Sequence, residues 1–379
     1  MDRWERISAL ATAVFVSRML AITAKSNARI DPAPPDAGLP FLSIVVPARN
    51  EERQIEPCVR SLLAQAYPNF EVIAVDDQSN DATLAILERL AAADSRLRLV
   101  NGVPLPPDWV GKPWALIQGA RAARGDWLLF TDADTVHDPR AAACAVRYAL
   151  ERHIQFLSLL PTQRFASLAE RALLPSILLA IAFAVGSLDA INDPRRLDAA
   201  IFNGQYLLCE RTAYHAIGSH ETVRGSLAED YDFARAVKRD GRFVSCLADS
   251  SDLVRTRMYR SAAEIWQGFT KNLYVGVRQN PAQAAAGIAL FAALSPLPEW
   301  LLLRAARSKK RRSALLPALC IAASSAAAEI AARRSRYPAG SGLFFPVGTA
   351  AMVGIFANSI AAHLTGRVAW RGRTYGGRA

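Results

Sequence analysis

Acidic side chains follow short apolar runs in this sequence, at spacings that suit cation and proton chemistry. Asp132 and Asp134 come after the run WLLF, one residue apart, so strand alternation would place both carboxylates on one face. Two such carboxylates can hold a hard divalent cation, Mg²⁺ or Mn²⁺, which keeps waters and takes further ligands from substrate phosphates. Because chance DxD matches are frequent, the prediction depends on the position of this pair at a strand end.

Two further acidic pairs stand at similar places. Asp76 and Asp77 end the run FEVIAVDD, where two like charges need hydrogen-bond donors such as a nucleoside base and a ribose supply. Glu229 and Asp230 open a predicted helix, whose dipole stabilises the ionised form and so suits a general base. A turn or a helix cap would also explain each pair, and the residues alone leave both explanations open.

Polar residues of other kinds complete the candidate set. Lys112 is expected in a glycine-containing loop before a helix, where its ammonium could meet a phosphate or a base, or simply be solvated. Asn203, Gly204 and Gln205 offer amide donors and a permissive backbone that could face an acceptor. The five histidines make no convincing metal set, and neither a nucleophile elbow nor a phosphate-binding P-loop motif is present.

Short apolar strands alternate with helical stretches from residue 41 onward. The expected strands cover 41–47, 70–77, 97–100 and 126–134, and the expected helices 51–66, 81–93 and 114–124. This alternation indicates an α/β domain, with a mixed but mainly parallel sheet and helices on both faces. Ligands of such sheets bind beyond the carboxyl ends of the strands, so the acids are expected to converge there.

The composition limits the class of protein. The chain has 379 residues, of which 51% are hydrophobic and 21% charged, so a chain disordered throughout is excluded. Its mean hydropathy of +0.11 favours a catalytic domain attached to membrane segments. Five scattered cysteines argue against a disulfide framework or a zinc ribbon. The net charge of +11 comes without a nucleic-acid-binding motif, and we assign it to contact with anionic lipid headgroups.

The chain divides into four expected regions. They are an N-terminal membrane anchor or interfacial helix (1–30), a Pro-rich linker (31–40), the α/β domain (41–275) and a C-terminal membrane region with a basic tail (276–379). Within them, the apolar runs 7–22, 283–303, 313–332 and 342–366 are the membrane candidates.

Charge asymmetry predicts the topology of the C-terminal region. Three full spans would place the basic loop 304–312 outside the cell, against the positive-inside tendency. Pro296 and Pro298 interrupt 283–303, so we predict a re-entrant or interfacial hairpin there and two true spans. The basic loop, the tail and the α/β domain would then all be cytoplasmic in a multi-pass protein of the cell membrane.

Taken together, these motifs resemble the inverting glycosyltransferase family 2, which has the GT-A fold. The matching pieces are VVPARNE (45–51), VDDQSND (75–81), GKPWA (111–115), DAD (132–134), NGQ (203–205) and AEDYD (228–232). The resemblance covers roughly 40–275 and implies a sugar donor linked to a nucleoside diphosphate, taken as uridine diphosphate, with Mg²⁺ or Mn²⁺ as cofactor. At subfamily level the chain looks most like membrane-associated members that glycosylate lipids, such as hopanoid- and carotenoid-associated enzymes.

The resemblance also implies roles for individual residues. Asp134, with Asp132 beside it, would bind the metal, and Asp230 would be the catalytic base. Asn203, Gly204, Gln205 and Glu229 would lie on the acceptor side. The nucleotide sugar would contact Pro47, Glu51, Asp76, Asp77, Lys112, Asp132, Arg371 and Arg373.

One departure from the family pattern bears on the product. Processive synthases of the family carry a QxxRW motif after the base, whereas residues 255–272 contain none. A lipid or lipid-like acceptor is therefore favoured over a polysaccharide synthase. The other alternative, a catalytically inactive membrane scaffold, is disfavoured because Asp132, Asp134 and Asp230 are all present. The run 171–191 could line the entry of such an acceptor or be a core helix, and Arg371 and Arg373 could contact diphosphate or lipid headgroups.

Overall fold

The computed structural model describes residues 1–23, 28–30, 38–308 and 311–375, without the side chain of residue 311. Most of the expected Pro-rich linker (31–37) and part of the basic loop (309–310) therefore lie outside the described residues. The chain forms two compact units. The sheet unit comprises Ser26–Arg164 and Leu188–Met258, and the helical unit comprises Met1–Lys25, Phe165–Ser187 and Tyr259–Ala379. The four sequential regions expected above stay a prediction about domains.

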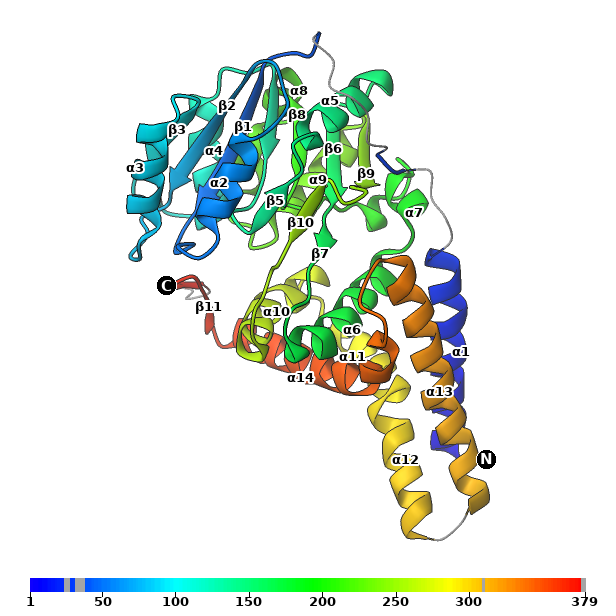
Figure 1. Ribbon diagram of the computed structural model, residues 1–379. Coiled ribbons are helices and arrows are strands. Elements are labelled where there is room, and N and C mark those ends of the chain that lie inside the picture. The colour runs from blue at the N-terminus through cyan, green and yellow to red at the C-terminus, as the bar shows by residue number, and fades with distance from the viewer. Residues whose placement is uncertain (24–27, 31–37, 309–310, 376–379) are drawn as a thin grey trace. The chain divides into compact units, whose positions relative to one another are not determined.

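The sheet unit is built on a seven-stranded, mainly parallel sheet (Figure 1). Among the described strands of this sheet, only β8 runs antiparallel to its neighbours, which are β4 and β6. In spatial order the strands are β3 (Leu97–Asn101), β2 (Phe70–Asp76), β1 (Leu42–Ala48), β4 (Trp127–Phe130), β8 (Leu207–Glu210), β6 (Phe156–Leu160) and β9 (Ser245–Asp249). A smaller sheet has the order β5 (Thr135–His137), β10 (Val254–Thr256) and β7 (Thr162–Gln163).

Helices cover both faces of the large sheet, as the near-continuous apolar strands require. Side chains of β1 alternate between the two cores, with Ile44 and Val46 on one side and Val45 on the other. The first core is closed by α2 (Ile55–Leu63), α3 (Thr83–Ala93) and α5 (Ala141–Glu151). The second is closed by α4 (Gly111–Ala122), α8 (Arg211–Ala216) and α9 (Glu229–Asp240). Shorter elements of this unit are α7 (Leu188–Asn192), η1 (Leu197–Ala199) and η2 (Ser219–Val223). This is the α/β architecture that the alternating pattern predicts.

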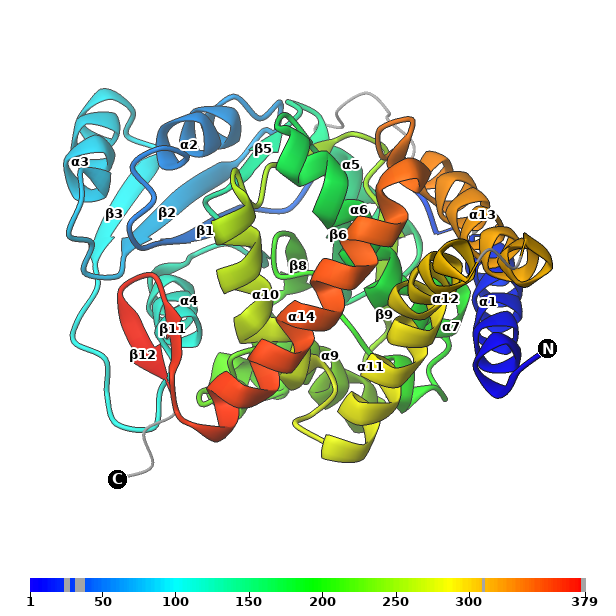
Figure 2. The same cartoon turned by 90° about the horizontal axis from the view of Figure 1, so that it is seen from below.

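The helical unit holds the long apolar helices (Figures 1 and 2). They are α1 (Arg3–Ile22), α6 (Leu168–Val185), α10 (Ala262–Gly276), α11 (Pro281–Leu294), α12 (Pro296–Arg307), α13 (Arg311–Arg334) and α14 (Phe345–Leu364), with η3 (Ser341–Phe344) before the last. Figure 2 shows α14 crossing α10, α6 and α11. A Cβ atom on Gly348 would lie 2.3 Å from Ser176 Oγ, so α14 approaches α6 closely through a small residue.

Four segments among the described residues are long and apolar enough to cross a membrane. They are Leu168–Val185, Pro281–Arg307, Arg312–Arg334 and Ser341–Leu364. The second is interrupted at Ser295, where α11 ends and α12 begins, which agrees with the helix break predicted from Pro296 and Pro298. These apolar helices indicate membrane association.

Candidate active site

The strand register brings the predicted acidic residues to one edge of the large sheet. Ala48 at the end of β1 pairs with Asp76 at the end of β2, and Phe130 at the end of β4 pairs with Leu207 at the start of β8. Because β8 is antiparallel, the segment 203–205 that precedes it lies at the same edge as the carboxyl ends of β1, β2 and β4.

Lys112 joins two of the candidate carboxylates directly. Its Nζ lies 2.7 Å from Asp132 Oδ1 and 2.7 Å from Glu229 Oε1. Burial alone would lower the pKa of Lys112, but the negative charges of Asp132, Glu229 and Asp230 raise it well above its usual value. The expected loop position is wrong, because α4 begins at Gly111 and Lys112 stands in its first turn. From there a charged ammonium faces three carboxylates.

Asp230 lies beside this ion pair, in the first turn of α9. Its Oδ2 accepts a hydrogen bond from Gly204 N at 3.1 Å and its Oδ1 one from Tyr231 N at 2.8 Å. Burial and the like charge of Glu229 raise the pKa of Asp230 to about 6, although Lys112 opposes that shift. A carboxylate of this basicity is ionised at neutral pH and takes up a proton readily, as a general base must.

Gly204 permits the close approach of these groups. A Cβ atom at this position would lie 2.8 Å from Lys112 Nζ and 3.3 Å from Glu229 Oε1. An alanine there would therefore displace the ammonium from the carboxylates, which explains the glycine between the two amide residues of the Asn203–Gly204–Gln205 segment.

Asp134 contacts the last residue of that segment. Gln205 Nε2 lies 3.3 Å from Asp134 Oδ2 and 3.4 Å from Oδ1, and it donates to Thr256 Oγ1 at 3.0 Å. Thr256 Oγ1 in turn donates to the Asp134 carbonyl at 3.2 Å. Gln205 Oε1 is buried and, within the described part of the chain, has no hydrogen-bond partner. This unsatisfied acceptor beside a carboxylate suits a cation or a hydroxyl donor.

The Asp132–Asp134 segment differs from the expectation in its backbone. β4 ends at Phe130, so the two acids belong to a turn and not to the expected strand 126–134, and alternation along a strand does not explain their common location. Hydrogen bonds to buried threonines hold the turn instead. Thr135 Oγ1 donates to the Asp132 carbonyl at 2.8 Å, and Thr131 Oγ1 donates to the Gln205 carbonyl at 2.7 Å.

A buried histidine completes this support. His137 Nε2 lies 3.1 Å from Thr131 Oγ1 and 2.9 Å from Thr135 Oγ1, and burial lowers the pKa of His137 to about 3. The neutral imidazole and two hydroxyls thus join the turn of Asp132 to the segment of Gln205. Our sequence reasoning missed Thr131, Thr135 and His137, although the threonines flank DAD symmetrically in TDADT.

The acids at the end of β2 form a neighbouring group. Asp76 Oδ2 accepts from Ser79 N at 3.2 Å, whereas its Oδ1 is buried and unpartnered in the residues that the structure describes. Asp77, also buried, donates its backbone N–H to the carbonyl of Ala48 at 2.8 Å, which ties the ends of β1 and β2 together. The free Asp76 oxygen suits an N–H or O–H donor of the kind that a nucleoside offers.

Pro47 and Glu51 lie on the β1 side of this group. Pro47 pairs in register with Val75, and the backbone N–H of Glu51 donates to Thr83 Oγ1 at 2.8 Å. Burial raises the pKa of the Cys58 thiol to about 12, and the charges of Asp134, Asp132 and Glu51 add to that rise. Glu51 therefore lies close enough to the DAD turn for its charge to act on a shared neighbour.

The donor set fits a divalent cation that needs few protein ligands. Burial raises the pKa of Asp132 to about 6, and the like charge of Asp134 adds to the rise while Lys112 opposes it. A cation near Asp134 would relieve this repulsion. No group of three or more His, Cys, Asp or Glu side chains arranged for a metal occurs among the described residues. Asp134, with Asp132 beside it, would thus leave several coordination positions for phosphate oxygens and water.

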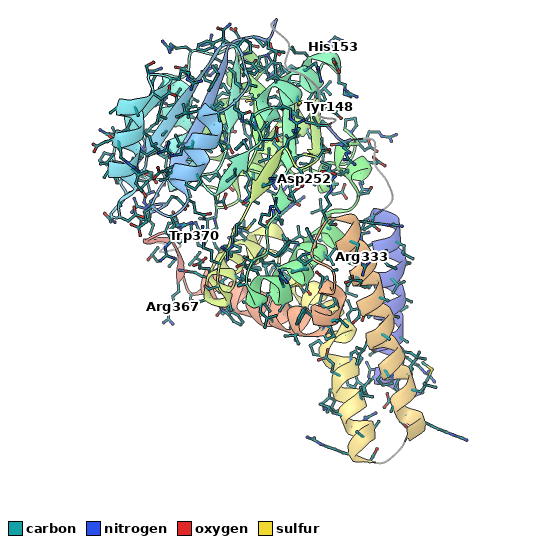
Figure 3. The ribbon with its side chains drawn as sticks, in the orientation of Figure 1. Tyr148, His153, Asp252, Arg333, Arg367 and Trp370 are labelled. Atoms are coloured by element: carbon teal, nitrogen blue, oxygen red, sulfur yellow. The ribbon has the colours of Figure 1, made fainter. Side chains whose placement is uncertain are left out.

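Arg371 and Arg373 belong to the helical unit, in the hairpin of β11 (Val368–Trp370) and β12 (Arg373–Tyr375). Arg371 (φ 47°) and Gly372 (φ 78°) form its two-residue turn, with the positive φ values that such turns require. Trp370, labelled in Figure 3, holds the hairpin to α10, because Lys271 Nζ lies 5.1 Å from its ring centroid. The contact of the two arginines with diphosphate stays a prediction.

Comparison with known proteins identifies the sheet unit. Residues 43–160, which include Lys112 and the DAD turn, match the family model described as glycosyl transferase family 2. This part of the sheet unit is therefore similar to glycosyl transferase family 2. The matched residues include two of the motifs on which the sequence resemblance depends, GKPWA with Lys112 and the DAD turn.

Curated relatives resemble the chain over parts of its length. A 4,4'-diaponeurosporenoate glycosyltransferase of Staphylococcus haemolyticus is 25% identical over 238 residues, which are 62% of this chain and 61% of the relative. Glycosyltransferase AglD of Haloferax volcanii is 40% identical over 104 residues, 26% of this chain and 16% of the relative. The chain thus spans about three fifths of the staphylococcal relative.

A solved structure supports the fold. The mannosyltransferase PcManGT of Pyrobaculum calidifontis, determined in complex with GDP-Man and Mn²⁺, aligns over 95% of this chain and 99% of its own, with a TM-score of 0.54 and 18% identity. At this identity the likeness is one of fold, and it confirms the expected GT-A architecture of the family 2 domain.

Proposed function

We propose that the chain is an inverting glycosyltransferase that moves one sugar from a nucleoside-diphosphate donor to a hydroxyl of a lipid or lipid-like acceptor at the membrane. The observation that carries the proposal is the contact between Lys112 and the carboxylates of Asp132 and Glu229, with Asp230 hydrogen-bonded to Gly204 beside them. A partly buried lysine among several acids at the edge of an α/β sheet suits a ligand that brings negative charge and hydroxyl groups.

The donor would bind along the ends of β1, β2 and β4. Pro47, Glu51, Asp76 and Asp77 would face the nucleoside, with the unpartnered Asp76 Oδ1 accepting a donor from the base or the ribose. Uridine diphosphate is the carrier that the resemblance implies. The Lys112 ammonium lies where a phosphate oxygen could replace one of its two carboxylate partners, and Arg371 and Arg373 would add positive charge from the C-terminal hairpin.

Asp134 and Asp132 would hold a divalent cation, Mg²⁺ or Mn²⁺. When bound, it would neutralise negative charge on the departing diphosphate. Two neighbouring residues hold Asp134 in position for this cation. Gln205 Nε2 contacts its carboxylate, and Thr256 Oγ1 donates to its backbone carbonyl.

Asp230 would act as the base. Its carboxylate would take the proton from the acceptor hydroxyl while that oxygen attacks the anomeric carbon opposite the leaving diphosphate, which inverts the configuration. Gly204 N donates to Asp230 Oδ2 and fixes the carboxylate, and the amides of Asn203 and Gln205 lie on the proposed acceptor side with Glu229.

The acceptor class rests on the helical unit and on the relatives. Four apolar segments indicate association with the membrane, where a lipid-like acceptor is dissolved. The relative from S. haemolyticus is named for glycosylating 4,4'-diaponeurosporenoate, which supports a lipid-like acceptor for this chain. We also propose that the helices make the chain a multi-pass membrane protein with the family 2 domain in the cytoplasm.

The direct test is transfer by the membrane-embedded chain. Membranes containing the wild-type chain or the Asp230→Asn variant are incubated with a panel of nucleotide sugars and extracted lipids, and the products are identified by mass. We expect a lipid heavier by one sugar residue with the wild type only. Absence of any glycosylated product across the panel, or equal product from Asp230→Asn, would contradict the proposed reaction or the proposed base.

A further inference from the structure

One face of α12 presents an aromatic residue, an aliphatic residue and two arginines in succession. Positions three, four, seven and eight residues after Trp300 share its helical face. Together these side chains line a cavity of about 390 Å³, formed by Trp300, Leu303, Arg304, Arg307 and Ser308. The cavity is therefore apolar toward the start of α12 and basic toward its end.

The basic end has more positive charge than its neighbours neutralise. Arg304 forms an ion pair with Asp2, and its guanidinium lies 5.0 Å from the centroid of the Trp300 ring. Arg307 has no ion-pair or hydrogen-bond partner among residues 1–23, 28–30, 38–308 and 311–375. A guanidinium that lines a cavity and lacks a counter-charge suits an anion with several acceptor oxygens.

The position of this face in the helical unit indicates where the anion comes from. The contact between Asp2 and Arg304 places the start of α1 beside the end of α12, and Figure 1 shows the start of α13 at the same end. Trp4 on α1 is 49% exposed and Trp300 is 50% exposed. Half-exposed tryptophans beside arginines, with Trp300 near the end of the apolar segment Pro281–Arg307, are typical of the headgroup level.

We propose that this face of α12 binds an anionic phospholipid. Its phosphodiester oxygens accept hydrogen bonds from Arg307 and from Arg304, and its acyl chain lies along Leu303 and the exposed part of the Trp300 ring. Charge complementarity and the order of the side chains, apolar then basic, match the order of acyl chain and phosphate in one lipid molecule.

The test measures lipid retention, without sugar donor or acceptor, so it is independent of glycosyl transfer. The full chain is purified in mild detergent with phosphatidylglycerol and phosphatidylcholine, and retained lipids are counted by native mass spectrometry. We expect the wild type to retain phosphatidylglycerol. Arg307→Gln should weaken that retention about fivefold, and Arg304→Gln with Arg307→Gln by more than tenfold.

Arg312→Gln is the matched control. It removes the same charge from the neighbouring helix α13 at an exposed residue that does not line the cavity. We expect it to retain phosphatidylglycerol like the wild type, with all variants eluting as folded protein of unchanged helical content. Equal loss in Arg307→Gln and Arg312→Gln, equal retention of phosphatidylcholine, or displacement by millimolar inorganic phosphate would each overturn the proposal.

Discussion

Lys112 is the residue on which the electrostatics of the site depend. It is the cation that contacts Asp132 and Glu229, and the Glu229 side chain is only 8% exposed. Removing one member of a buried ion pair leaves an uncompensated charge, which costs more than the loss of a surface pair. The Lys112–Glu229 ion pair should therefore contribute more to the free energy of unfolding than ion pairs on the surface of the same unit.

A double-mutant cycle tests this difference. We expect Lys112→Met and Glu229→Gln to show a coupling free energy of about 1–2 kcal/mol in unfolding. The matched control is the exposed pair Arg121 and Glu221, 2.9 Å apart, for which the coupling should stay below about 0.5 kcal/mol. Equal coupling free energies in the two cycles would show that Lys112 stabilises the fold no more than a surface lysine does.

The pH dependence of transfer is set by Asp230. Because a base must be ionised, and because burial and Glu229 raise the pKa of Asp230 to about 6, the rate should fall as the pH drops below about 6. Glu229→Gln removes a like charge, so the acidic limb should move to lower pH. Asp232→Asn, at an exposed residue of the same helix, should leave the limb unchanged. A rate independent of pH between 5 and 7, measured with saturating donor, would contradict this assignment.

At the scale of elements, the buried hydroxyls between β4 and β5 join the DAD turn to the segment before β8. Thr131 Oγ1 contacts the Gln205 carbonyl, Thr135 Oγ1 and His137 Nε2 at once. Groups that orient metal-binding or catalytic residues in this way typically affect activity almost as strongly as the residues they orient. The turn and the segment should therefore move apart when the hydroxyl is removed.

Thr131→Val removes the hydroxyl and keeps the shape. We expect kcat/KM to fall about tenfold and the metal concentration for half-maximal rate to rise, since Asp132 and Gln205 lose their common support. Thr131→Ser restores the hydroxyl and should return both quantities to within about twofold of the wild type. If serine performs no better than valine, the methyl packing of Thr131 matters and its hydrogen bonds do not.

The elements that could be predicted from the sequence are those with a strong hydrophobic pattern. Continuous apolar runs identified β1 and β2, and register then brought their polar ends together, as expected. The end of β4 was predicted too late, because the residues of the polar turn after this apolar strand continue the alternating pattern of a strand in the sequence. The start of α4 was predicted too late as well, since Gly111 and Pro113 in its first turn disguise a helix start. The support from His137 depends on burial, which a single sequence does not reveal.

At the scale of the whole molecule, the two units are interleaved along the chain. The segment Phe165–Ser187 belongs to the helical unit although it lies between the two stretches of sequence that form the sheet unit. Hydrophobicity marked this run as exceptional, but hydrophobicity alone did not distinguish a core helix of the sheet unit from a member of the helical unit. Its amphipathic character is weak because several helices of one unit surround it, as the contacts of α6 with α14, α10 and α13 show.

The contact between Asp2 and Arg304 makes a prediction about topology. These residues belong to the start of α1 and the end of α12, so they lie on the same side of any membrane that the helical unit crosses. Reporters fused to the N-terminus and after Ser308 should therefore give the same location. A reporter after Ser308 that reads the opposite side from the N-terminus would contradict the structure of the helical unit.

The central claim is that acids from separate parts of the chain bind a nucleoside diphosphate through a cation at one sheet edge. Calorimetry of uridine diphosphate binding to the full chain, with Mn²⁺ or with chelator, tests it most directly, and guanosine diphosphate is measured in parallel. We predict metal-dependent binding to the wild type, its loss in Asp134→Ala, and its retention in Asp240→Asn, a partly exposed carboxylate paired with Arg242. Binding that is unaffected by chelator, or unchanged in Asp134→Ala, would contradict the account.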